Sequence, residues 1–200
     1  MVTPSLPQFD SQHTLATRKN FNRVWLVYGL LGLTLALVLP DKSARYPQTI
    51  FEIASGFVTQ IPTASRLVEL TKFPGAMTVW WFVMWIILPL AAWKAGLQHE
   101  RTNCKPFFLS VWNKSSWLMS IALVIVPLTF YYFLIFGAIN FVPKYDGGHG
   151  RAGVSLIVSS RVGLGFIGSM LMVCAGMIVG WLGTYAVGIY DVLTSRGINK

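Results

Sequence analysis

Four apolar blocks separated by polar segments constrain this chain more than any other feature of its sequence. The last three blocks reach the roughly 20 apolar residues that a helix needs to cross a bilayer. A helix satisfies its backbone hydrogen bonds internally, which hydrocarbon requires of any segment that crosses it. The sequence therefore predicts an all-α integral membrane protein with four transmembrane helices, at residues 24–39, 74–93, 117–139 and 162–190.

The composition agrees with a lipid environment. Only 12% of the 200 residues are charged, against roughly 25% in a soluble domain. The net charge of +9 could indicate nucleic acid as a partner, but the basic residues lie between the apolar blocks and form no run of five or six. At those places they contact anionic lipid headgroups. We expect the lipid bilayer as a partner and no nucleic acid.

The first apolar block resembles a secretory signal peptide, but its surroundings favour an uncleaved span. A long polar segment precedes it, and Lys42 stands where a cleavage site needs a small residue. We therefore expect a mostly flexible N-terminal tail, a single transmembrane domain and a short C-terminal tail, at residues 1–23, 24–190 and 191–200.

The distribution of Lys and Arg predicts the orientation. Nine of the sixteen lie in the two tails and the loop between the second and third spans, and seven lie in the other two loops. The positive-inside rule then places both termini in the cytoplasm. With no targeting segment in so compact a chain, we expect the bacterial inner membrane.

The loop after the first span contains an amphipathic stretch at residues 50–70. Its apolar residues follow helical spacing, and Pro62 suits the first turn of a second short helix that ends at Leu70. Such a helix lies along the headgroup plane with its apolar face in lipid, or covers the bundle, or binds a partner. We expect an interfacial amphipathic helix in this loop.

No Asp, Glu, Lys, Arg or His lies inside any of the four spans. Ionisable residues within a membrane mark proton relays, ion paths and counter-ions. Their absence from the sequence of the spans argues against a proton-coupled carrier and a voltage sensor, and against a b-type haem protein, which needs histidine ligands within its spans. The cysteines, Cys104 and Cys174, form no Cys-x-x-Cys motif. We expect no cofactor and no metal.

Tyr131 and Tyr132 fall in the middle of the third span. A phenolic hydroxyl in hydrocarbon needs a hydrogen-bond partner. We expect a hydrogen bond to another helix, or else a polar lining.

The last span is rich in small residues, which let two helix backbones approach closely in lipid. Gly176 and Gly180 form a GxxxG pair, Gly165 and Ser169 form a similar pair, and Gly183 falls on the face of Gly176. This helix-packing interface serves either the other spans of the chain or a second subunit.

The third loop contains a glycine-rich stretch at residues 144–151. Asp146, His149 and Arg151 could bind an anion or supply a general base. The stretch matches no phosphate-binding fingerprint, and a flexible turn with solvated charges explains it equally.

These features favour a non-catalytic membrane subunit that scaffolds or anchors a larger inner-membrane assembly, for example a secretion, conjugation or energy-transducing complex. Its partners would be other membrane subunits or further copies of itself. Three alternatives stay open. They are a small oligomeric transporter or channel, an immunity or exclusion protein, and an enzyme that acts on lipid at the interface through the third loop.

Overall fold

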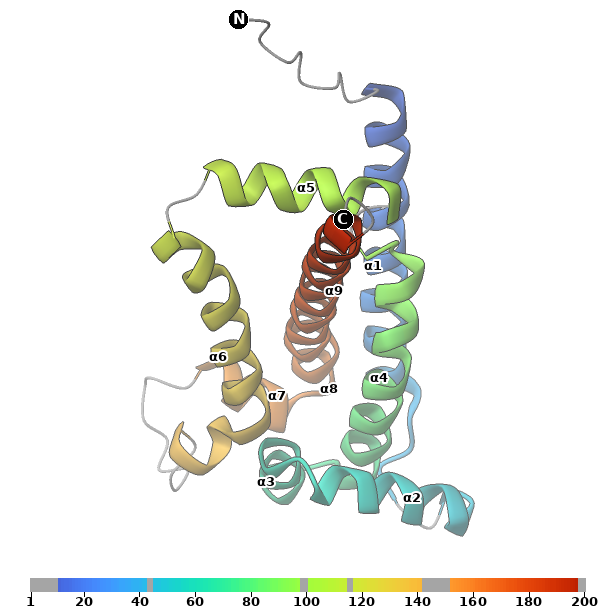
Figure 1. Cartoon of the computed structure of the whole chain (residues 1–200). Coiled ribbons are helices and arrows are strands. Elements are labelled where there is room, and N and C mark those ends of the chain that lie inside the picture. The colour runs from blue at the N-terminus through green and yellow to red at the C-terminus, as the bar shows by residue number, and fades with distance from the viewer. Residues whose placement is uncertain (1–10, 43–44, 98–100, 115–116, 142–151, 198–200) are drawn as a thin grey trace, which may run out of the picture.

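The computed structural model describes residues 11–42, 45–97, 101–114, 117–141 and 152–197, and the regular structure within these ranges is entirely helical (Figure 1). The helices are α1 (Ser11–Val38), α2 (Gln48–Thr59), α3 (Pro62–Leu70), α4 (Pro74–Lys94), α5 (Arg101–Lys114), α6 (Trp117–Phe141), α7 (Ala152–Ser159), α8 (Arg161–Gly163) and α9 (Ser169–Gly197). A π-helical turn, η3 (Leu164–Gly168), joins α8 to α9. The predicted all-α class is confirmed.

Three helices are long and apolar enough to cross a membrane, over Arg18–Val38, Pro74–Lys94 and Arg161–Ser195. They correspond to the first, second and fourth predicted spans. In α6 the apolar part that the structure describes, Ile121–Phe136, is shorter than such a helix. The chain is thus consistent with a membrane protein that has at least these three spanning segments.

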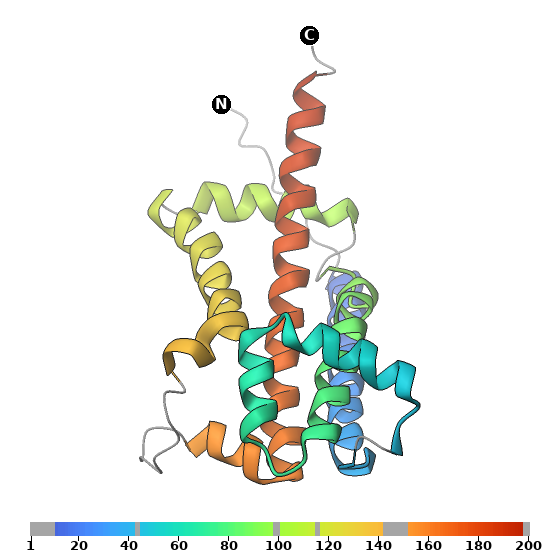
Figure 2. The same ribbon diagram turned by 90° about the horizontal axis from the view of Figure 1, so that it is seen from below.

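The long helices alternate in direction. In Figures 1 and 2, α1 and α6 run one way and α4 and α9 run the other. The start of α1, the end of α9 and helix α5 lie at one end of the molecule, and α2, α3 and α7 lie at the opposite end.

Helix α4 forms the centre of the core between α1, α2 and α9. Trp80, Met77 and Met84 are completely buried. Two hydrogen bonds join α4 to α1, because the Trp80 indole donates to the carbonyl of Gly32 over 2.7 Å and the Tyr28 hydroxyl donates to the carbonyl of Met84 over 2.7 Å. Helix α4 is apolar on every face, including the one that exposes Ile86 and Leu90, as expected of a helix in the core of a bundle or in a membrane.

The amphipathic loop forms α2 and α3, and the predicted helix that begins at Pro62 and ends at Leu70 is confirmed. Ala54 and Val58 bury one face of α2. Phe57 meets Phe82 of α4 edge to face, with ring centroids 5.7 Å apart. Helix α3 packs chiefly against α6.

A sharp corner joins α7 to α8. The extended residue Ser160 accepts a hydrogen bond from the backbone N–H of Gly163 at 3.3 Å, which begins the long C-terminal helix. An added Cβ at Gly163 would lie 2.1 Å from the carbonyl oxygen of Leu156, so only glycine fits where α7 folds back on this helix.

Hydrogen bonds also join α7 to the residues that follow α3. The carbonyl of Val158 accepts hydrogen bonds from Lys72 N–H at 3.2 Å and Thr71 Oγ1 at 2.9 Å.

Helical structure extends further than the sequence predicted. Helix α1 begins at Ser11 and α9 continues to Gly197, within segments that we expected to be tails. Neither extension contains proline, so each helix propagates from its apolar span at little cost. The polar loop at residues 94–116 contains α5, and the loop at residues 140–161 contains α7.

Candidate functional site

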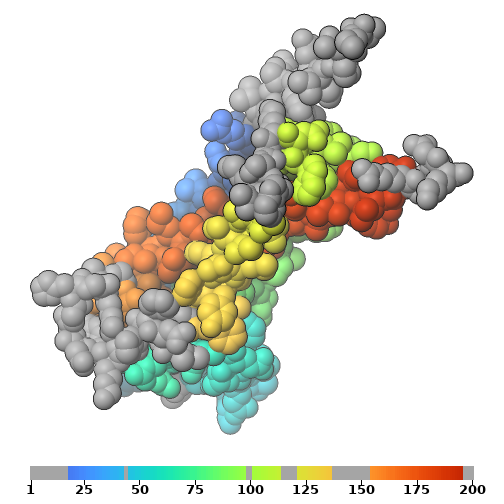
Figure 3. Space-filling model, turned by 60° about the vertical axis from the view of Figure 1, so that its left-hand side comes forward, coloured from blue at the N-terminus to red at the C-terminus, as the bar shows by residue number. Residues whose placement is uncertain are grey.

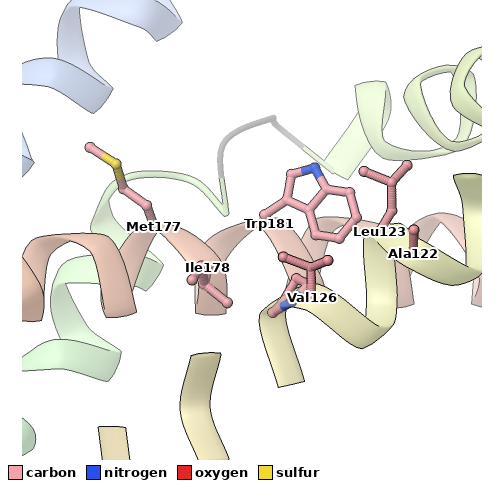
Figure 4. A pocket seen from close by; sticks show the side chains of 7 residues that line it. Ala122, Leu123, Val126, Met177, Ile178 and Trp181 are labelled. Atoms are coloured by element: carbon pink, nitrogen blue, oxygen red, sulfur yellow. The ribbon is translucent and has the colours of Figure 1, made fainter. Parts of the chain in front are cut away.

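The loosely packed part of the bundle lies between α6 and α9, which make few contacts with each other. A cavity of about 390 Å³ occupies this position. In Figure 4, Trp181 reaches from α9 toward α6. Apart from the indole N–H, the lining is apolar, so the cavity suits an apolar occupant. Its lining residues are Ala122, Leu123, Val126, Pro127, Met177, Ile178 and Trp181.

A series of aromatic contacts connects this cavity with α5. Trp181 stacks on Tyr185 with ring centroids 5.3 Å apart, and Tyr185 meets Phe108 edge to face at 5.0 Å. Phe108 stacks in turn on Trp112 at 5.9 Å. These rings hold α5 across the end of the α6–α9 gap, roughly perpendicular to the long helices (Figure 1).

Helix α5 approaches α9 closely at Gly188. A Cβ there would lie 2.6 Å from the Cβ of Phe108 and 2.7 Å from the carbonyl oxygen of Cys104. The Lys105 ammonium donates a 2.9 Å hydrogen bond to Ser195 Oγ, further along α9. Cys104 is 1% exposed, and burial raises the pKa of its thiol. The crossing is therefore a tight junction that a small residue makes possible.

Basic side chains gather at the end of the molecule that carries α5. The acidic side chain described at this end is Asp191, whereas the opposite end combines five described cations with Asp41, Glu52 and Glu69. The α5 end thus has the greater excess of positive charge among the described residues. Its described cations are Arg18, Lys19, Arg23, Lys94, Arg101 and Lys105.

The predicted helix-packing residues of the last span face other parts of this chain. A Cβ on Gly165 would lie 2.7 Å from Leu33 Cδ1, and one on Gly176 would lie 2.3 Å from the Trp25 ring, both on α1.

Of the remaining predicted packing residues, two are buried and Gly183 is partly buried. Ser169 is 3% exposed and faces Gly32 of α1. A Cβ on Gly183 would lie 3.0 Å from Leu97, beyond the end of α4. Gly180 is buried, and its carbonyl accepts a 2.9 Å hydrogen bond from Thr184. None of the five predicted residues lines the cavity.

The predicted loop site lies outside the described residues, because Asp146, His149 and Arg151 fall within residues 142–151. Among the residues that the structure does describe, no three His, Cys, Asp or Glu side chains come together as a metal site.

Hydroxyl and indole groups are the polar groups of the described interior. The predicted inter-helix hydrogen bond of Tyr131 is confirmed, since its hydroxyl donates to the carbonyl of Ala175 on α9 over 2.5 Å. Four buried side-chain polar atoms have no hydrogen-bond partner within the described ranges: Ser169 Oγ and the indole nitrogens of Trp25, Trp81 and Trp85. Tyr132, by contrast, is 53% exposed.

Arg161 joins two helix ends at the face opposite α5. Its guanidinium donates to the carbonyls of Leu37 at 2.8 Å and Ala36 at 3.5 Å, and it pairs with the Asp41 carboxylate. The backbone carbonyl of Asp41 accepts a 3.2 Å hydrogen bond from Gly75 N–H. Carbonyls at a helix C-terminus lack partners within their own helix, so the arginine serves as a cap for α1.

The sequence predicted neither the cavity between α6 and α9 nor helix α5. A signal for α5 was present, because Phe108 and Trp112 are spaced as neighbours on one helical face. The polar flanks and Pro106 favoured a loop instead. The cavity had no such signal, since it depends on how far α6 stands from α9.

No protein-family model, curated protein or solved structure matches this chain.

Proposed function

We propose that this chain is a non-catalytic, four-span subunit that anchors a larger assembly in the bacterial inner membrane. The fourth span would be α6, whose 25 residues make a helix about 37 Å long, compared with about 30 Å of hydrocarbon. The alternating directions of α1, α4, α6 and α9 support this arrangement (Figures 1 and 2). An even number of spans also agrees with the position of the start of α1 and the end of α9 at the same end of the molecule (Figures 1 and 2).

The same proposal places that end, with α5, in the cytoplasm. The cations of α5 and its neighbours support this orientation through the positive-inside rule. Helices α2 and α3 would lie along the opposite membrane surface as the interfacial amphipathic segment. The exposed side chains of Ile50 and Ile53 suit a position against lipid.

The observation that carries the anchoring role is an exposed apolar stripe on the last turns of α9. Ala186, Ile189, Tyr190 and Leu193 share one helical face, away from the side on which Gly188 and Ser195 contact α5. Tyr190 is 59% exposed and Leu193 is 62% exposed. In Figures 2 and 3 this end of α9 projects past α5. An apolar stripe on a projecting helix is a typical surface for pairing with a helix of another subunit.

The internal use of small residues supports this choice of surface. Gly165 and Gly176 are in contact with α1, so they do not offer the close-packing face that a partner would need. The partner would contact the C-terminal stripe, which the bundle leaves uncovered.

Purification in a mild detergent, followed by mass spectrometry of co-purifying chains, tests the proposal. The wild-type chain should bring down at least one other membrane subunit in a fixed ratio, and Tyr190→Ala/Leu193→Ala should release it. The control is Met170→Ala/Leu171→Ala, which removes exposed apolar side chains from α9 within the membrane and should keep the partner.

A chain that purifies alone would overturn the anchoring role. Specific solute flux through liposomes that contain only this protein would also overturn it, in favour of a transporter or channel.

A further inference from the structure

The cavity between α6 and α9 lies at the outer surface of the bundle rather than in its core. Val126, one of its lining residues, is 65% exposed. The core residues Trp80 and Met172 are completely buried elsewhere. Molecules of the surrounding bilayer would therefore reach the cavity from the side.

The depth of the cavity matches one leaflet. Met177 and Trp181 precede Gly188, where α5 crosses α9, by eleven and seven residues. At 1.5 Å per residue the cavity lies about 10 to 17 Å from the crossing, measured along α9. Half of a hydrocarbon core is about 15 Å thick. A cavity at this distance from α5 is at the level of the acyl chains of the leaflet on which α5 lies.

Helix α5 has the features of a helix at the headgroup level. Trp112 on α5 and Trp93 at the nearby end of α4 are 55% and 75% exposed, and tryptophan is enriched where headgroups meet hydrocarbon. Phe108 and Cys104 face α9, while Arg101 is exposed. Among the described residues, Lys105 donates to Ser195 Oγ, and an ammonium carries three donors, so it can also contact an anion.

We propose that this site binds one anionic phospholipid. An acyl chain occupies the cavity between α6 and α9, and the phosphate and acidic headgroup contact Arg101 and Lys105 on α5. The excess of cations at this end of the molecule selects an anionic headgroup over a zwitterionic one. The apolar lining holds a chain without requiring hydrogen bonds from it. This binding needs no partner subunit, so it goes beyond the anchoring role proposed above.

Native mass spectrometry of the full chain, released from detergent after titration with defined lipids, tests the proposal. The probes are phosphatidylglycerol and phosphatidylcholine with identical acyl chains. The wild-type protein should retain one phosphatidylglycerol at least tenfold more tightly than phosphatidylcholine. Arg101→Gln/Lys105→Gln should lower the affinity for phosphatidylglycerol about thirtyfold, the effect of two cations near an anionic surface, and remove the preference.

Two further variants separate the acyl site from the headgroup site. Ala122→Trp fills the cavity and should weaken binding of both lipids. Ala122→Leu should weaken it to a smaller extent, and this variant replaces Ala122→Trp if the tryptophan prevents folding. Val27→Trp adds the same ring to an exposed position of α1 and is the control, with unchanged binding. Arg66→Gln/Lys72→Gln removes two cations at the opposite end and should leave the lipid preference intact.

Equal affinity of the wild-type protein for the two lipids would overturn the proposal. The proposal would also be overturned if Arg66→Gln/Lys72→Gln lost the lipid preference to the same degree as Arg101→Gln/Lys105→Gln. The attraction would then depend on the net charge of the protein and not on the cations of α5. A protein that purifies without partners yet binds the lipid selectively would reject the anchoring role and keep this one.

Discussion

The indole N–H of Trp80 donates a 2.7 Å hydrogen bond to the backbone carbonyl of Gly32, and the two residues are 48 positions apart in the chain. The bond joins α4 to α1 at a completely buried position. Trp81, the next residue after Trp80, is almost as deeply buried, at 4% exposure. Its indole nitrogen has no hydrogen-bond partner in the part of the chain that the structure describes. The pair therefore separates the effect of a buried hydrogen bond from that of a buried ring.

We expect Trp80→Phe to be more destabilising than Trp81→Phe. Trp80→Phe removes the indole donor, so the buried carbonyl of Gly32 loses this hydrogen bond. The loss costs about 1 to 3 kcal/mol of unfolding free energy. Removal of the unpaired donor at position 81 relieves a desolvation cost and offsets part of the lost ring contact. Unfolding in mixed micelles of increasing SDS content measures both variants. Equal losses would show that ring volume alone accounts for the effect.

We expect Gly176→Ala to weaken the packing of α1 on α9. The new Cβ would lie 2.3 Å from the Trp25 ring, an overlap that forces a shift and costs about 1 to 3 kcal/mol. The control is Gly56→Ala on α2, where no atom lies within 4 Å and alanine should stabilise the helix by about 0.5 to 1 kcal/mol. The same SDS titration compares the two variants. Trp25→Phe combined with Gly176→Ala should recover part of the loss, since the overlapping ring atoms are removed.

We expect Arg161→Gln to lower the free energy of unfolding more than Asp41→Asn does. The side chain of Asp41 is 53% exposed, so the ion pair itself contributes no more than about 1 kcal/mol and weakens with salt. Arg161 also caps the carbonyls of Ala36 and Leu37, and Asp41→Asn leaves those bonds in place. A double-mutant cycle at low and high salt checks this. A coupling free energy as large as the whole effect of Arg161→Gln would contradict the capping role.

We expect Gly188→Ala to expose Cys104. The added methyl separates α5 from α9, which uncovers the thiol. Burial raises the pKa of Cys104, so in the wild-type protein less thiolate is present at a given pH and maleimide labelling is slow. The variant should react faster, and its rate should rise at lower pH than in the wild type. Both are measured in a Cys174→Ala background, in which Cys104 is the remaining thiol. An unchanged rate would mean that the junction tolerates the methyl.

Local signals in the sequence predicted part of this fold well. Pro62 and Pro74 each occupy the first turn of a helix, and the predicted starts of α3 and α4 are confirmed. Both prolines act locally, because a fixed φ and a missing N–H suit that position whatever surrounds it. The hydrogen bond of Tyr131 was likewise predictable from the cost of an unpaired hydroxyl in lipid.

The parts that the sequence did not predict depend on contacts between distant segments. Helix α5 rests on α9 where Gly188 allows a close approach, and the spacing of Phe108 and Trp112 predicts a helix but not that contact. The partners of Gly165 and Gly176 lie on α1, at least 129 residues away, so periodicity alone left open whether the stripe served this chain or another.

The π-helical turn at Leu164–Gly168 sets the phase between the two ends of the C-terminal helix. A π-turn contains one residue more than an ordinary helix would use over the same path, so deletion of one residue there should leave an ordinary α-helix along nearly the same path. Arg161 would then stay at the end of α1, and α7 would keep its place beside Thr71 and Lys72. The same deletion within the regular turns of α9 would instead rotate Arg161 by about 100° away from the first helix, so the π-turn is where this helix can lose a residue at least cost.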